Sequence, residues 1–125
     1  MSVNDIFILF LAFNIKQFLG DFVFQNTYML TKDRDNWDFF LPLVTHSMIH
    51  AFLSLMIILF IKPSCWYLFF IDLGLHFFID RVKAGKNYLG KYNHAEIKGY
   101  WIIFGADQLL HHCTHFLIIY LMTQI

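Results

Sequence analysis

One arrangement of side chains that could do chemistry recurs along this sequence: two polar residues, mostly histidines and carboxylates, spaced four positions apart. His76 and Asp80 are the clearest pair, because they lie in the mainly apolar run 65–82. Residues four apart share one face of an α-helix. Imidazole nitrogens and carboxylate oxygens bind zinc, iron and manganese, and they also serve as general acids and bases. The same spacing occurs in three further apolar segments, in the pairs Asp21 and Gln25, His46 and His50, and Asp107 and His111.

The composition indicates an integral membrane protein. Of the 125 residues, 58% are hydrophobic and only 14% are charged, whereas soluble domains carry about 25% charged residues. A charged side chain near the centre of a bilayer costs about 2.5–3.5 kcal/mol on insertion scales, so such residues in membrane helices generally have a function. The nine basic and nine acidic residues balance. Without a net positive charge, we expect no nucleic-acid partner.

Four apolar segments have the length of about 20 residues that a membrane-spanning helix needs. We therefore predict an all-α fold with a single domain over residues 1–125, an integral membrane bundle of four transmembrane helices. The predicted helices cover about 5–25, 39–61, 65–82 and 100–122.

The first segment is the least apolar of the four. Its polar residues Asn14, Gln17, Asp21 and Gln25 fall within about 80° of one another around a helix. Lys16 lies on the far side of that helix. We expect it to extend its amine toward the membrane surface or to meet another subunit.

The loop charges predict the orientation. Two loops on one side hold seven Lys and Arg residues, whereas the other side holds only Lys62. Basic loops stay in the cytoplasm, so both termini are predicted to lie outside it. At a rise of 1.5 Å per residue, at least one member of each pair then falls within roughly 3 to 11 Å of the cytoplasmic boundary, namely Asp21, His46, His76, Asp80 and Asp107. The pairs are thus predicted to form one polar layer near the cytoplasmic end of the bundle.

This layer has the chemistry of a metal site, with zinc, manganese or iron as the expected divalent ion. Such an ion lowers the pKa of water and polarises an ester or phosphoester, and a position near the interface suits an amphiphilic substrate. The candidate ligands are His46, His50, His76, Asp80, Asp107 and His111. The candidate catalytic carboxylates are Asp21, Asp80 and Asp107, and the candidate substrate-binding or ligand-orienting residues are Gln25, Lys83 and Gln108.

No other catalytic motif competes with this interpretation. The sequence has no GxSxG, no glycine-rich phosphate loop and no HExxH motif. His46 and His50 have the two-histidine spacing of HExxH, but Ser47 stands where the glutamate base would be.

Two other functions stay open from the sequence. An ion or proton transport protein would use the same layer, but its polar path should continue to the outer side. Asp72 and His115 reach deeper, whereas 55–60 and 117–121 offer no continuation. A structural or partner-binding protein would use the layer only to hold its helices together. The expected partners are the lipid bilayer and an amphiphilic substrate, and a homo-oligomer is compatible with the sequence.

The polar positions, taken together, resemble a family of small bacterial and phage membrane proteins, the domain of unknown function thirty-three-oh-seven. The matching residues are the stretch 20–25, His46 with His50, the stretch 76–80 with Lys83, and the stretch 107–111. The resemblance implies a multi-helix membrane fold in a bacterial inner membrane or that of a phage-infected host, and it implies no activity. A looser similarity of the paired histidines to membrane-bound metal-dependent hydrolases favours hydrolysis over transport.

Overall fold

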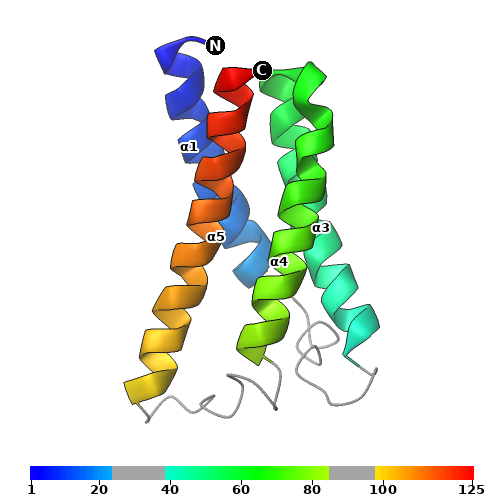
Figure 1. Cartoon of the computed structure of the whole chain (residues 1–125), viewed down its shortest axis with the longest axis vertical. Coiled ribbons are helices and arrows are strands. Elements are labelled where there is room, and N and C mark those ends of the chain that lie inside the picture. The colour runs from blue at the N-terminus through cyan, green and yellow to red at the C-terminus, as the bar shows by residue number, and fades with distance from the viewer. Residues whose placement is uncertain (24–38, 85–97) are drawn as a thin grey trace.

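The computed structural model describes residues 1–23, 39–84 and 98–125, and every regular element in this part of the chain is helical (Figure 1). The predicted all-α class is therefore confirmed. The long elements are α1 (Val3–Phe18), α3 (Phe40–Ile61), α4 (Phe69–Ala84) and α5 (Lys98–Gln124). Two short elements extend them: the π-helical η1 (Leu19–Val23) continues α1, and the 3-10 helix η3 (Pro63–Leu68) precedes α4.

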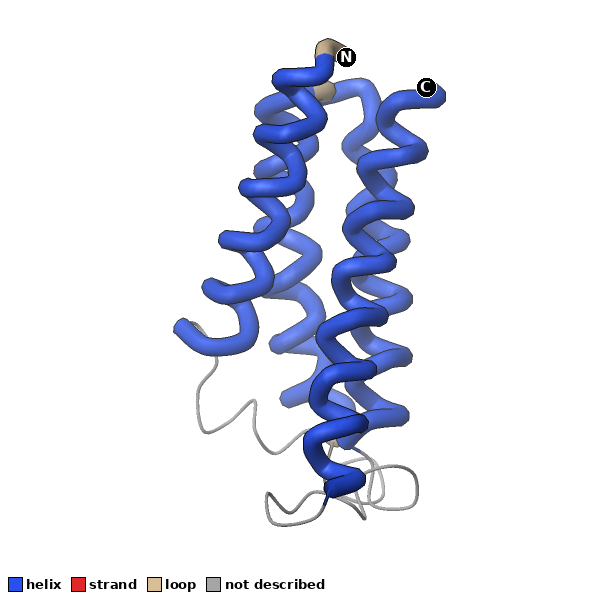
Figure 2. Tube along the Cα trace, turned by 90° about the vertical axis from the view of Figure 1, so that its left-hand side faces the viewer, coloured by secondary structure: helices blue, strands red, loops and turns tan. Residues whose placement is uncertain are grey.

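The four α-helices run side by side in alternating directions (Figures 1 and 2). Helix α3 packs against both α1 and α4, and α5 packs against the other sides of α4 and α1. Both chain termini lie at the end of the molecule where η3 connects α3 to α4 (Figure 1). Side chains from all four helices can therefore meet along a common central axis.

Helix boundaries follow local signals. The Ser2 hydroxyl accepts a hydrogen bond from the Asp5 backbone N–H, and the Asp5 carboxylate accepts one from the Ser2 N–H, at 3.1 and 3.0 Å. This reciprocal cap starts α1 two residues earlier than predicted. Pro63 ends α3 and opens η3. Because residues 63–68 adopt 3-10 geometry, α4 begins at Phe69 and not at residue 65 as predicted.

Three helices in the described residues are long and apolar enough to cross a membrane: Val3–Val23, Phe40–Ile61 and Gly99–Gln124. Their outer surfaces are apolar as well; Phe7 and Phe60 are 67% and 84% exposed. Many apolar side chains of this kind face outward, which fits contact with lipid. The fourth span, through η3 and α4, stays a prediction, because α4 carries acidic and basic residues among its apolar ones.

The interior differs between the two ends of the molecule. Near the termini it is an apolar core built from α1, α3, η3 and α5: Leu9, Phe13, Ile58, Cys65, Leu68, Ile118, Ile119 and Met122. Farther along the helices, most of the buried side chains are histidines, aspartates and other polar residues. The helices therefore enclose a polar interior next to an apolar core.

Candidate metal centre

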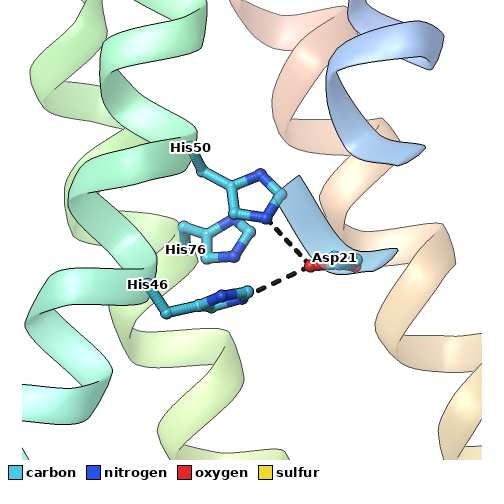
Figure 3. A group of neighbouring side chains, drawn as sticks. All are labelled: Asp21, His46, His50 and His76. Carbon is cyan, nitrogen blue, oxygen red and sulfur yellow. Dashed lines mark hydrogen bonds and ion pairs between the residues drawn. The ribbon is translucent and has the colours of Figure 1, made fainter. Parts of the chain in front are cut away.

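Three histidines from two helices face the Asp21 carboxylate. His46 and His50 lie one turn apart on α3, His76 lies on α4, and Asp21 lies on η1 (Figure 3). The Oδ1 atom of Asp21 is 2.9 Å from His50 Nε2 and 3.3 Å from His46 Nε2. All three histidines are at most 1% exposed. These four residues offer ligand atoms that lie within 4.8 Å of one another, so they form one group that could hold a metal ion.

A second group forms around the buried carboxylate of Asp80. Its Oδ2 atom lies 2.9 Å from His76 Nε2 and 3.2 Å from His46 Nε2, while its Oδ1 atom lies 3.1 Å from His111 Nε2. His76, Asp80 and His111 also have ligand atoms within 4.8 Å of one another. The two groups therefore share His76 and adjoin through Asp80.

Asp107 adds a third carboxylate. Its Oδ1 atom is 3.0 Å from His111 Nε2, and its Oδ2 atom accepts hydrogen bonds from Lys83 Nζ at 3.2 Å and from Gln108 Nε2 at 3.1 Å. On the other side, the amide of Gln17 donates to Asp21 Oδ2 at 2.7 Å. Amide and amine donors thus hold the two outer carboxylates in place while leaving an oxygen of each turned toward the histidines.

Three of the four imidazole rings in these groups, those of His50, His76 and His111, are stacked on one another. The ring centroids of His50 and His76 are 3.9 Å apart, and those of His76 and His111 are 4.1 Å apart, with the planes 28° and 26° from parallel. Stacked rings fix one another's side-chain angles. The positions of the candidate ligand atoms are therefore set by packing as well as by hydrogen bonds.

Several of these close approaches are not hydrogen bonds. His76 Nε2 and Asp80 Oδ2 are 2.9 Å apart, yet within the described residues neither atom has a hydrogen-bond partner. The same holds for Asp107 Oδ1, although it is 3.0 Å from His111 Nε2. Buried polar atoms are nearly always satisfied, and an ion is one of the ways in which this happens. Imidazole nitrogens and carboxylate oxygens that lie within 4.8 Å of one another can serve as ligands of one metal ion.

Glycine at position 20 permits the contact between η1 and α3. A Cβ atom there would overlap the Cε1, Nε2 and Nδ1 atoms of the His50 ring. Because glycine has no side chain, the backbone before Asp21 can lie directly against this ring. No role was predicted for Gly20 alone, since a close approach between two helices has no local signature in the sequence.

Lys16 lies in a second buried polar network, one turn or more from the metal groups. Its Nζ atom donates to Asp72 Oδ2 at 2.8 Å and is 2.9 Å from His115 Nε2, and Ser54 Oγ donates to the same Asp72 oxygen at 2.5 Å. Lys16 is only 2% exposed. The prediction that it reaches the membrane surface or another subunit was therefore wrong.

The reason for that error is the direction in which α1 faces. Its buried residues include Leu9, Phe13, Lys16 and Gln17, whereas Asn14 of the predicted polar face is exposed. In a membrane helix the outer face is apolar as well as the buried face, so the positions of the apolar residues do not show which face is buried. The ion pair with Asp72 offsets the cost of burying the amine. A lone lysine in an apolar segment was the available signal for an acidic partner on another helix.

Two hollows adjoin the candidate metal centre. A polar cavity of about 80 Å³ is lined by Asp21, Phe22, Asp80, Lys83, Phe104, Asp107 and Gln108. A larger groove of about 170 Å³ lies between α4 and α5 and is lined by Phe78, Ile79, Val82, Lys83, Ile102, Ile103, Ala106, Asp107 and Leu110. Lys83 and Asp107 line both hollows, so the apolar groove and the polar cavity are adjacent.

The structure brings most of the predicted site residues together. The residues of this set that lie in or beside the two metal groups are Asp21, His46, His50, His76, Asp80, Lys83, Asp107, Gln108 and His111. Gln25 lies outside the described residues.

Fold and site together define a helical protein with three helices long and apolar enough to span a membrane and with buried His/Asp groups that could hold a metal ion. The chain belongs to the family described as Protein of unknown function (DUF3307), whose profile matches residues 6–125. This match confirms the resemblance noted from the sequence. No curated protein and no solved structure matches the chain.

Proposed function

We propose that this protein binds a divalent metal ion inside the membrane and uses it to hydrolyse an amphiphilic ester or phosphoester. The observation that carries the proposal is the convergence of His46, His50, His76 and His111 Nε2 atoms on the oxygens of Asp21 and Asp80. A purely structural network would be expected to pair each donor with an acceptor. The unbonded approach of His76 to Asp80 favours a cation instead.

The ligand chemistry favours zinc, manganese or iron. Both groups offer imidazole nitrogens and carboxylate oxygens, and neither includes Cys65 or Cys113. Mixed nitrogen and oxygen sites suit these borderline or hard ions, whereas thiolates would favour copper(I) or an iron–sulfur cluster. Bound haem is disfavoured, because the stacked histidines leave no flat apolar slot between them.

Hydrolysis needs space for water beside the carboxylates. The polar cavity of about 80 Å³ supplies this space and is lined by Asp21, Asp80 and Asp107. A divalent ion there would lower the pKa of a water molecule and polarise the ester. The water adds to the ester centre, the bond to the alcohol breaks, and an aspartate takes the water proton and returns it to the departing alcohol.

An amphiphilic substrate fits the two adjoining hollows. The groove between α4 and α5 is lined mainly by aliphatic and aromatic side chains, which suit an acyl or similar chain. Lys83, whose side chain is 31% exposed, lies where the groove meets the cavity and could bind an anionic headgroup. The substrate would then approach laterally from the bilayer.

The proposed setting is a bacterial inner membrane, or that of a phage-infected host, with four spans and both termini outside the cytoplasm. Burial of Asp72 and Asp80 supports α4 as the fourth span, since these carboxylates face the interior while Phe70 and Phe78 face outward. A homo-oligomer is compatible with this arrangement.

Transport by the same residues is less well supported. Toward the termini, the polar interior of the described residues ends at Lys16, Asp72 and His115. Beyond them lie fully buried apolar side chains, among them Ile58 and Met122. A proton or ion path would require polar groups or water to continue through this core.

Metal analysis tests the proposal. Elemental analysis of the detergent-purified parent should find a stoichiometric transition metal, and His76→Ala and Asp80→Ala should lose it. His112→Ala is the matched control, because this histidine is only half-buried and is in neither metal group. A folded parent without metal, or unchanged metal content in both variants, would refute metal binding. Turnover of long-chain phosphodiesters and carboxylic esters with the bound metal then tests hydrolysis.

A further inference from the structure

The number of candidate ligands is large for one ion. The His/Asp cluster, defined as Asp21, His46, His50, His76, Asp80, Asp107 and His111, contains seven side chains with short contacts to one another. A zinc ion in a protein takes about four ligands and a manganese or iron ion about six, often including water. Each of these side chains is also more than four-fifths buried. The surplus of buried ligands indicates more than one ion.

Asp80 divides the cluster into two ligand sets. Its Oδ2 atom faces His46 and His76, whereas its Oδ1 atom faces His111 at 3.1 Å. Asp21 contacts His46 of the first set and also His50, whereas Asp107 contacts His111 of the second set. A carboxylate whose two oxygens face different ligand sets is the usual bridge between two ions about 3.5–4 Å apart.

We propose that the cluster holds two divalent cations bridged by Asp80. The inner cation is bound by Asp21, His46, His50 and His76. The outer cation is bound by His111 and Asp107, and it borders the polar cavity that Asp107 lines. This inference rests on the proposed metal-binding function and extends it.

Two dications also define the substrate class. The carboxylates of the cluster carry three negative charges, and Lys83 next to Asp107 carries one positive charge. One dication would already balance these charges, so a second leaves an excess of positive charge in a buried site. An anionic phosphoester would neutralise this excess, whereas a neutral carboxylic ester would not. We therefore expect phosphoester amphiphiles to be the preferred substrates.

Metal stoichiometry tests the two-cation site. Detergent-purified protein is loaded with Mn²⁺, separated from free ion and analysed for manganese per chain and by electron paramagnetic resonance. The parent should hold two ions per chain with the broadened spectrum of a coupled pair. Asp107→Asn should hold one ion with the six-line spectrum of isolated Mn²⁺, and Asp5→Asn, an aspartate at the start of α1, should behave as the parent.

The outcomes separate this inference from the proposed function. One ion in the parent, with no change in Asp107→Asn, would overturn the two-cation site but leave metal binding intact. A folded parent with no bound ion would overturn both. Two ions in both the parent and Asp107→Asn would refute the assignment of Asp107 to the outer ion. Equal hydrolysis of carboxylic esters and phosphoesters would refute the substrate preference.

Discussion

The contact between Gly20 and His50 allows a sharp test of the site geometry. In Gly20→Ala, the new methyl group would lie closer than 3.0 Å to three atoms of the His50 ring, which is too close for any Cβ contact. The ring cannot move freely, because its Nε2 atom is 2.9 Å from Asp21 and its face is stacked on His76. We expect the substitution to displace either the ring or the η1 backbone.

The magnitude follows from two opposing effects on the free energy of unfolding. Overpacking a buried site costs about 1–3 kcal/mol, whereas replacing glycine by alanine inside a helix stabilises it by about 1 kcal/mol. The net loss of stability should therefore be only about 0–2 kcal/mol. Misplacing one ligand should weaken metal binding more clearly, by about 10- to 100-fold.

The assay compares three glycine variants in the same detergent. Gly74→Ala and Gly105→Ala are matched controls, because a Cβ at either position meets nothing within 4 Å. Metal affinity is measured by titration against a coloured chelator, and folding by circular dichroism during thermal unfolding. Only Gly20→Ala should lose affinity. If all three variants bind the metal as the parent does, His50 is not held in position by its contact with Gly20, and the reasoning fails.

Three further predictions concern the ion pair between Lys16 and Asp72, the binding of an anionic headgroup by Lys83, and the binding of the substrate's long apolar chain in the groove. Lys16→Met should lower the free energy of unfolding by about 3–5 kcal/mol, because it removes the cation that pairs with the buried Asp72 carboxylate. In unfolding titrations, adding Asp72→Leu should recover most of this loss. No recovery in the double variant would contradict the ion pair. Lys83→Ala should raise KM for an anionic amphiphile about 10-fold, the effect of about 1.4 kcal/mol, without releasing metal, whereas loss of metal would show that Lys83 acts on the cluster. Ala106→Trp should fill the groove between α4 and α5 and slow turnover of long-chain substrates but not of short-chain ones. Equal slowing of both would show that the substrate's apolar chain binds outside this groove.

The sequence alone determined the features of this protein that depend on local spacing. Runs of about 20 apolar residues predicted the helices, and α3 begins within one residue of its predicted start and ends at its predicted end. The four-residue spacing placed His46 with His50, and His76 with Asp80, on common faces. Their ligand chemistry also follows from residue type.

Only the tertiary structure decided which faces meet. Lys16 turned out to be buried against Asp72, and Gly20 against His50. The sequence could not reveal this, because a membrane helix is apolar on its outer face and its polar residues do not mark the buried side reliably. The division of the cluster around the two oxygens of Asp80 likewise depends on the packing of α3, α4 and α5, since His46 and His111 are distant in sequence. Spacing along one helix supplies the ligands, but contact between helices decides which of them can share an ion.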